Sequence, residues 1–108
     1  MSLFPTRTDW DAARTAAHLD TDAHHDMHAG ELEVSILLHV QPQLVGSGYR
    51  DGDHAADERP ILLVHGMRAY TETGVIGKPS AGTPEKGQLL LASIVASFGQ
   101  HLDLLNGR

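Results

Sequence analysis

The hydrophobic positions follow a helical period over the last quarter of the chain. Apolar residues recur there at three- and four-residue steps: Leu91, Ile94, Val95, Phe98, Leu102 and Leu105. Such spacing places them on one face of an α-helix. Thr83 and Pro84 offer a cap and a first helical residue, and Asn106-Gly107 offers an end. The pattern predicts a helix over 84–105.

A second helical pattern occupies residues 30–40. Leu32, Ile36 and Val40 form its apolar stripe, and Leu37 widens it. Pro42 ends the pattern because proline cannot continue a helix. His39 falls in the last turn, where a cationic side chain is favourable, so a helix-end role is expected for it.

A third helix is predicted over residues 10–18. Thr8 or Asp9 can cap it, and its alanines favour the helical state. Trp10, Ala13 (or Arg14) and Ala17 share one face. We therefore expect this helix to pack through Trp10.

The remaining segments read as one short strand between long loops. The apolar run Pro60–Gly66 predicts a buried strand that ends in a His-Gly turn. Residues 46–59 and 67–84 are rich in glycine and polar residues, without periodicity. Asp51-Gly-Asp53 lacks the later ligands of a calcium loop, and no G-x-S-x-G elbow of a serine hydrolase occurs.

Composition excludes several classes of function. The chain has 108 residues, enough for one domain at most, with a net charge of −6 and no cysteine. The acidic balance argues against a nucleic-acid partner, and the missing thiols exclude disulfides and cysteine ligands. Neither a signal-like start nor a membrane-length apolar run is evident, so a cytoplasmic location and no membrane partner are expected.

Candidate chemistry gathers where the loop meets the second helix. His28, Glu31 and Glu33 lie at the start of that helix, where exposed N–H groups and the helix dipole favour carboxylates. A histidine beside a carboxylate can transfer protons or be fixed in one tautomer. A charged helix start with a solvent-exposed histidine explains the same residues.

Two stretches together resemble the creatininase family of metal-dependent amidohydrolases. The first motif, His28-Ala-Gly-Glu-Leu-Glu-Val-Ser35, is similar to the family's H-A-G-x-x-E-T-S helix start. The second motif, Gly74-Val-Ile-Gly-Lys-Pro-Ser-Ala-Gly-Thr-Pro-Glu-Lys-Gly87, is similar to the loop before the family's last helix. The resemblance covers residues 22–105 and only the C-terminal part of the family fold.

The resemblance implies an α/β fold. The chain would be the C-terminal portion of a three-layer α/β/α sandwich, with 1–108 a single partial domain of two amphipathic helices, one or two short strands and long loops. The family's Glu-x-His and Asn-Gly-His segments, which hold its zinc or manganese ions, do not occur here. We therefore expect no certain metal ligand and no activity in the isolated chain, and either a homo-oligomer or a missing N-terminal half.

The resemblance also implies roles for individual residues. His28 would move a proton to the leaving nitrogen, and Glu33 would orient that histidine or approach the metal region. Glu31 is expected to stabilise the helix start. Substrate contacts would come from His24, Asp26 and Met27, and the substrate would be a small cyclic or linear amide cleaved at its C–N bond.

Two other functions fit the sequence. The chain could be a non-catalytic assembly piece, with its last helix as the docking surface. Alternatively, it could be a small metal-binding protein that uses four histidines: His18, His24, His25 and His28.

Overall fold

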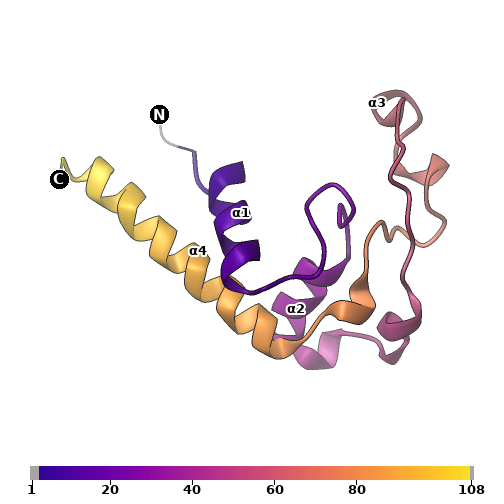
Figure 1. The fold of residues 1–108 in the computed structure, drawn as a ribbon, viewed down its shortest axis with the longest axis horizontal. Coiled ribbons are helices and arrows are strands. Elements are labelled where there is room, and N and C mark those ends of the chain that lie inside the picture. Colours follow the sequence, from indigo (N-terminus) through magenta and orange to yellow (C-terminus); the bar gives the residue numbers. More distant parts are fainter. Residues whose placement is uncertain (1–2, 108) are drawn as a thin grey trace.

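A computed structural model describes residues 3–107 and is mainly helical. Its α-helices are α1 (Arg7–Ala16), α2 (Glu31–Val40), α3 (Leu62–His65) and α4 (Pro84–Leu105). Short 3₁₀ turns lie at Pro42–Leu44, Ser47–Asp51, Met67–Ala69 and Pro79–Ala81. The long helix α4 runs diagonally, with α1 beside its middle, α2 at its N-terminal half and α3 in a distant loop (Figure 1).

The two main helices confirm the sequence prediction. The Thr83 hydroxyl accepts the Lys86 N–H at 3.1 Å and caps α4, while Pro84 is its first residue. Gly107 follows the helix with a φ of +71°, in the left-handed region that favours glycine. Helix α2 has Gly30 as its N-cap residue and ends before Pro42, as expected.

Helix α1 begins earlier than predicted. Thr6, rather than Thr8 or Asp9, caps it. Its hydroxyl accepts the Asp9 N–H, and the Asp9 carboxylate accepts the Thr6 N–H at 2.8 Å, which completes a capping box. Two reciprocal hydrogen bonds stabilise this start better than a single cap further along the chain.

The core lies where α1 and α4 meet. Ala13, Ala17 and Leu90 are buried at its centre, and four partly buried side chains surround them: Leu19, Leu32, Ile36 and Ile94. The predicted face of α1 is confirmed at Ala13 and Ala17, but Trp10 is half-buried and does not belong to this core. The small alanines allow the two helices to approach closely, and Trp10 is left at the edge, where it lines a cleft.

Helices α2 and α4 cross through small residues. A Cβ atom on Gly87 would lie 2.0 Å from the Ser35 carbonyl oxygen, so only glycine fits there. The Ser35 hydroxyl, fully buried, accepts the Thr83 N–H at 3.1 Å. The side of α2 that carries Ser35 and Val34 is consequently buried, whereas Val40 of the predicted stripe remains 51% exposed.

The predicted strand at Pro60–Gly66 is wrong. Leu62–His65 forms a single helical turn, and both Leu63 and Val64 are exposed. A strand needs a neighbour for its backbone groups, and pairing within residues 3–107 is limited to two isolated antiparallel bridges, His28 with Ile76 and His54 with Gly77. The three-layer sandwich stays a prediction.

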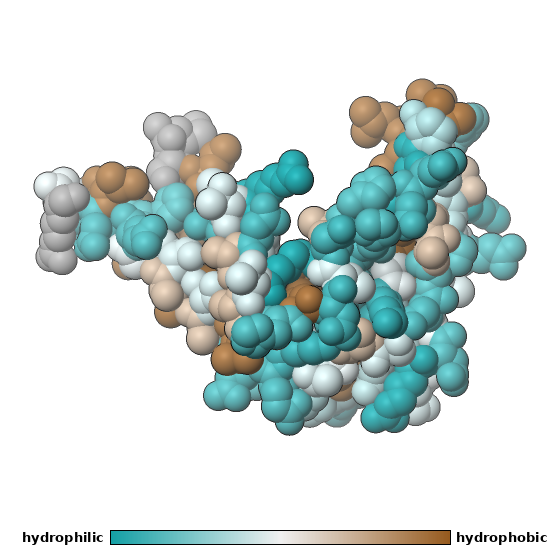
Figure 2. Space-filling model, in the orientation of Figure 1, coloured by the Kyte–Doolittle hydropathy of each residue, from teal (hydrophilic) through white to brown (hydrophobic). Residues whose placement is uncertain are grey.

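Apolar side chains remain exposed along the second half of α4. Val95, Leu104 and Leu105 are each more than two-thirds exposed. Apolar patches cover the C-terminal end of α4 and the region of α3 (Figure 2). Helix α4 is long and apolar enough to cross a membrane, judged by length and composition alone. Core helices of soluble proteins meet the same two criteria.

Candidate active site

The Asp26 carboxylate connects the two sequence motifs. It accepts the N–H groups of Glu31 at 2.7 Å and Leu32 at 3.1 Å, at the start of α2, and that of Lys78 at 3.0 Å, in the second motif. The Arg14 guanidinium lies 3.7 Å from the same carboxylate. Since the Asp26 side chain is 1% exposed, this arrangement favours a positioning role over the substrate contact that the resemblance implies.

Two glycines make room for this carboxylate. A Cβ atom on Gly30 would lie 1.7 Å from Asp26 Oδ1, and one on Gly77 would lie 2.4 Å from it. Gly30 belongs to the first motif and Gly77 to the second. Both glycines therefore leave room for the same buried group, which joins the two motifs in this chain.

Glu31 forms a second buried junction, beyond the helix-start role predicted for it. Its fully buried carboxylate accepts the N–H groups of Asp20 and Thr21, each at 2.9 Å, and the Lys86 ammonium at 2.6 Å. Burial alone would raise the pKa of Glu31, but these donors outweigh it and hold the pKa below its ordinary value. Glu31 thus joins the 20–21 loop, α2 and α4.

Acid should weaken the fold through Glu31. Because its pKa is lowered in the folded chain, the unfolded chain takes up the proton first, and stability falls as pH drops below about 4.5. The raised pKa of Lys86 acts only above its ordinary value of 10.5. We expect urea midpoints at a series of pH values to fall below pH 4.5 and Glu31→Gln to flatten that fall. Glu85→Gln, at an exposed carboxylate of α4, is the control; an equal flattening there would contradict this assignment.

The His28 ring is held in one orientation by the second motif. The backbone of His28 pairs with that of Ile76 through two hydrogen bonds of 3.0 Å, and ring Nδ1 lies 2.7 Å from the Gly74 carbonyl oxygen. A carbonyl oxygen can only accept, so Nδ1 carries the hydrogen and donates it. In the neutral ring, Nε2 then holds the lone pair and is available as a base.

The Glu33 carboxylate bonds to the backbone next to His28. It accepts the N–H of Ala29, the residue between His28 and the helix cap. Ala29 has a φ of +53°, in the left-handed region. Within the part of the chain that the structure describes, Glu33 therefore supports the backbone that carries His28, and its orienting or metal-facing role stays a prediction.

The other predicted site residues lie in the preceding loop. His24 Nε2 lies 2.7 Å from the Asp57 carbonyl oxygen, and His25 Nδ1 lies 2.7 Å from the Asp22 carboxylate. That carboxylate raises the pKa of His25 above its ordinary value. Met27 lines the cleft beside α1 and α2.

The histidines do not gather into a metal site. Across residues 3–107, no three histidine or carboxylate side chains could together hold a metal ion. The structure therefore gives no support to a histidine-rich metal-binding protein built from His18, His24, His25 and His28.

Sequence reasoning missed two residues of the site. His54 pairs its backbone with Gly77, and its Nε2 lies 2.7 Å from the Tyr70 carbonyl oxygen, so its ring tethers the same loop as His28. No periodicity or spacing pointed to it. Lys86 was visible only as a member of the second motif, and the sequence did not indicate that it pairs with Glu31.

Comparisons with known proteins relate this chain to curated peptidases. The mycofactocin precursor peptide peptidase of Mycobacterium tuberculosis is 39% identical over 75 residues, which cover 65% of this chain and 29% of that protein. Its namesakes from Mycobacterium ulcerans and Mycolicibacterium smegmatis are 34% and 33% identical over 73 residues, with 65% of this chain covered and 29% and 30% of theirs. The match thus spans less than a third of these relatives. No solved structure matches the chain.

The family comparison extends over almost the whole chain. The profile of the creatininase family, described as creatinine amidohydrolase, matches residues 1–102. That range includes α1, α2, both motifs and most of α4. The chain therefore belongs to the creatininase family.

Proposed function

We propose that this chain is part of a hydrolase that cleaves a C–N bond of a peptide, with His28 as its proton-transfer group. The observation that carries the proposal is the hydrogen bond from His28 Nδ1 to the Gly74 carbonyl oxygen, which leaves Nε2 as the only basic nitrogen of the neutral ring. Family membership supplies the reaction class, hydrolysis.

The expectation of a small amide substrate is wrong. The curated relatives are named as peptidases of the mycofactocin precursor peptide. A peptide presents the same C–N bond on a larger molecule, so the chemistry inferred from the resemblance carries over while the substrate class changes. We therefore place a peptide at His28.

In this proposal His28 transfers protons, and the Glu33 and Asp26 carboxylates position it. Nε2 of His28 takes a proton from the attacking water and delivers it to the leaving nitrogen. Throughout, Nδ1 donates to the Gly74 carbonyl, which holds the ring and stabilises its charged form. Glu33 fixes the Ala29 amide, and Asp26 fixes the start of α2 against the second motif, so both position His28 without reacting.

The described residues do not fit the metal of the family. Creatininase-family hydrolases generally depend on zinc, yet residues 3–107 contain no group of three suitable ligands. We infer that metal ligands come from a part of the family fold outside this chain, and that the chain contributes to a three-layer α/β/α sandwich there. Four expectations from the sequence stay predictions. They are the alternative role as a non-catalytic assembly piece, the identity of the metal as zinc or manganese, the cytoplasmic location and the homo-oligomeric state.

A chimera tests the proposal. Residues 1–102 of this chain, the range that the family profile matches, replace the corresponding residues of the Mycobacterium tuberculosis peptidase, and cleavage of the precursor peptide is followed by mass spectrometry with zinc present. We expect cleavage by the chimera and none by the 108-residue chain alone. A folded, zinc-loaded chimera that fails to cleave, or turnover by the isolated chain, would overturn the proposal.

A further inference from the structure

A cleft beside the candidate site has no role in the reaction described above. It has a volume of about 510 Å³ and lies between α1, the loop before His28 and α2. Its lining is largely apolar and includes Trp10, Ala23, Leu32 and Ile36. Glu33 also lines this cleft, and its carboxylate accepts the N–H of Ala29, the residue after His28, so the cleft reaches the backbone that carries His28.

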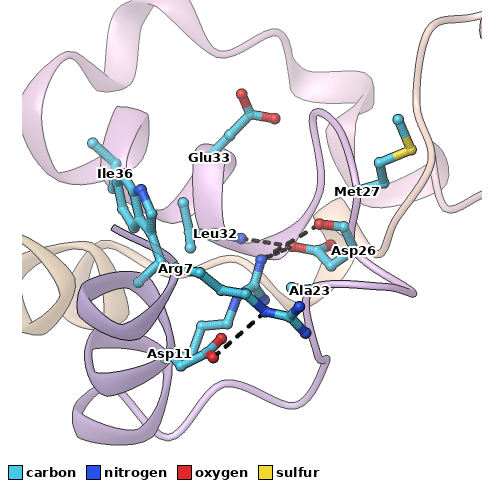
Figure 3. Close-up of a pocket in the computed structure, with 10 residues that line it drawn as sticks. Arg7, Asp11, Ala23, Asp26, Met27, Leu32, Glu33 and Ile36 are labelled. Atoms are coloured by element: carbon cyan, nitrogen blue, oxygen red, sulfur yellow. Dashed lines mark hydrogen bonds and ion pairs between the residues drawn. The ribbon is translucent and has the colours of Figure 1, made fainter. Parts of the chain in front are cut away.

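The rim of the cleft carries groups of both signs. Arg7 and Asp11 face each other at 3.9 Å, and Glu33 lies on the far side of Leu32 from them (Figure 3). Both members of the Arg7–Asp11 pair are mostly exposed, so their attraction is weak and either can bind something else. Guanidinium groups only donate hydrogen bonds and carboxylates only accept them.

An apolar lining together with a rim of both charges favours a ligand that has an apolar side chain and neutral polar groups. The apolar lining accommodates a hydrocarbon side chain, because the burial of apolar surface is favourable. A mixed rim matches a neutral group that offers both N–H and C=O groups, which a peptide backbone does and a lipid chain does not. The volume lies within the roughly 300–1,000 Å³ range of ligand pockets.

We infer that this cleft is a specificity pocket that receives an apolar side chain of the peptide substrate, next to the bond that His28 acts on. The inference rests on the proposed function for the identity of the ligand as a peptide. Trp10 supplies the aromatic part of the lining, and the Arg7, Asp11 and Glu33 side chains meet the flanking backbone amides. Ala23 sits on the loop side of the cleft and leaves space that a larger side chain would fill.

The single tryptophan of the chain reports on binding. The 108-residue protein is titrated with N-acetyl-L-leucinamide, which does not fluoresce, and the emission of Trp10 is followed, with N-acetylglycinamide as the ligand that lacks the side chain. We expect a saturable change with the leucinamide at millimolar concentration and at least a tenfold weaker response with the glycinamide. Equal responses to both ligands, or no saturable response, would overturn the inference.

Two variants that replace an alanine with leucine locate the binding site. Ala23→Leu fills the cleft from an exposed loop position and should weaken leucinamide binding at least tenfold. Ala12→Leu places the same side chain at an exposed position of α1 that does not line the cleft, and should leave binding unchanged. If Ala23→Leu bound leucinamide as tightly as the parent chain, the assignment would be contradicted. A change of Trp10 emission with protein concentration in the absence of ligand would also contradict it, because that change would indicate a second copy of the chain in the cleft.

Binding and catalysis are scored separately. Because the titration requires no turnover, leucinamide binding by a chain whose chimera does not cleave would refute the proposed hydrolysis and leave the pocket standing. Cleavage by the chimera without side-chain preference would refute the pocket alone. In a cleaving chimera, Ala23→Leu should raise the KM for a peptide with a leucine side chain and leave kcat nearly unchanged.

Discussion

Replacing Asp26 with alanine should destabilise the chain by about 3–5 kcal/mol, the typical cost of removing one partner from a buried charged network. The change removes the acceptor of three backbone N–H groups, those of Glu31, Leu32 and Lys78, and leaves the Arg14 guanidinium without its carboxylate. A buried donor without an acceptor keeps its full desolvation penalty. Since small domains are stable by only about 5–15 kcal/mol, the loss is a large fraction of the total.

Urea unfolding followed by circular dichroism measures this effect. Asp22→Ala is the matched control, because Asp22 is an exposed carboxylate of the same loop whose partner is the exposed His25. We expect the midpoint of Asp22→Ala to stay close to that of the parent chain. If Asp26→Ala were no less stable than Asp22→Ala, the junction between the two motifs would not depend on this carboxylate.

Replacing His28 with alanine in the chimera should lower kcat about 100-fold or more at an unchanged zinc content, in keeping with the loss of a general acid–base group. The exposed ring contributes one hydrogen bond to the fold, to the Gly74 carbonyl, so stability should change little. Peptide cleavage rates and zinc analysis of the same preparations measure the two quantities.

Two further variants separate proton transfer from positioning. His28→Gln keeps a side-chain donor near Gly74 but cannot accept a proton, so its activity should stay as low as that of His28→Ala. His39→Ala, at the other end of α2, should retain full activity. Loss of zinc from His28→Ala would make His28 a metal ligand instead, and recovery of activity in His28→Gln would reduce His28 to a structural residue.

The helices were predictable because their determinants are local. Thr83, Pro84 and Gly107 define the ends of α4 through hydrogen bonds and backbone angles that involve neighbouring residues only. The same reasoning failed at α1, where it predicted Thr8 or Asp9 as the cap and the structure has Thr6. What decided the start was the reciprocal Thr6–Asp9 pair, a spacing that is visible in the sequence.

The candidate site depends on contacts between distant residues. Asp26 meets Lys78, and Glu31 meets Lys86, across more than 50 positions of the chain. Neither pairing leaves a periodic signal, so Asp26 reads as a loop residue and Glu31 as a helix-start charge. The glycines of the two motifs were visible, but the reason for them, the space taken by the Asp26 carboxylate, was not.

The strand prediction at Pro60–Gly66 was wrong for a different physical reason. The apolar run at Pro60–Gly66 has the composition of a buried strand, but a strand exists only with a partner. Residues 3–107 supply no neighbour for it, and Leu63 is fully exposed. An apolar run alone cannot separate a strand from a helical turn.

The state of the His28 ring tests the account most directly. Long-range ¹H–¹⁵N correlation spectra of the 108-residue chain above pH 8 distinguish a protonated from an unprotonated ring nitrogen. The hydrogen bond to Gly74 predicts that Nδ1 carries the hydrogen and that Nε2 is bare, so that Nε2 can accept a proton. His28 found with its hydrogen on Nε2 would contradict this account.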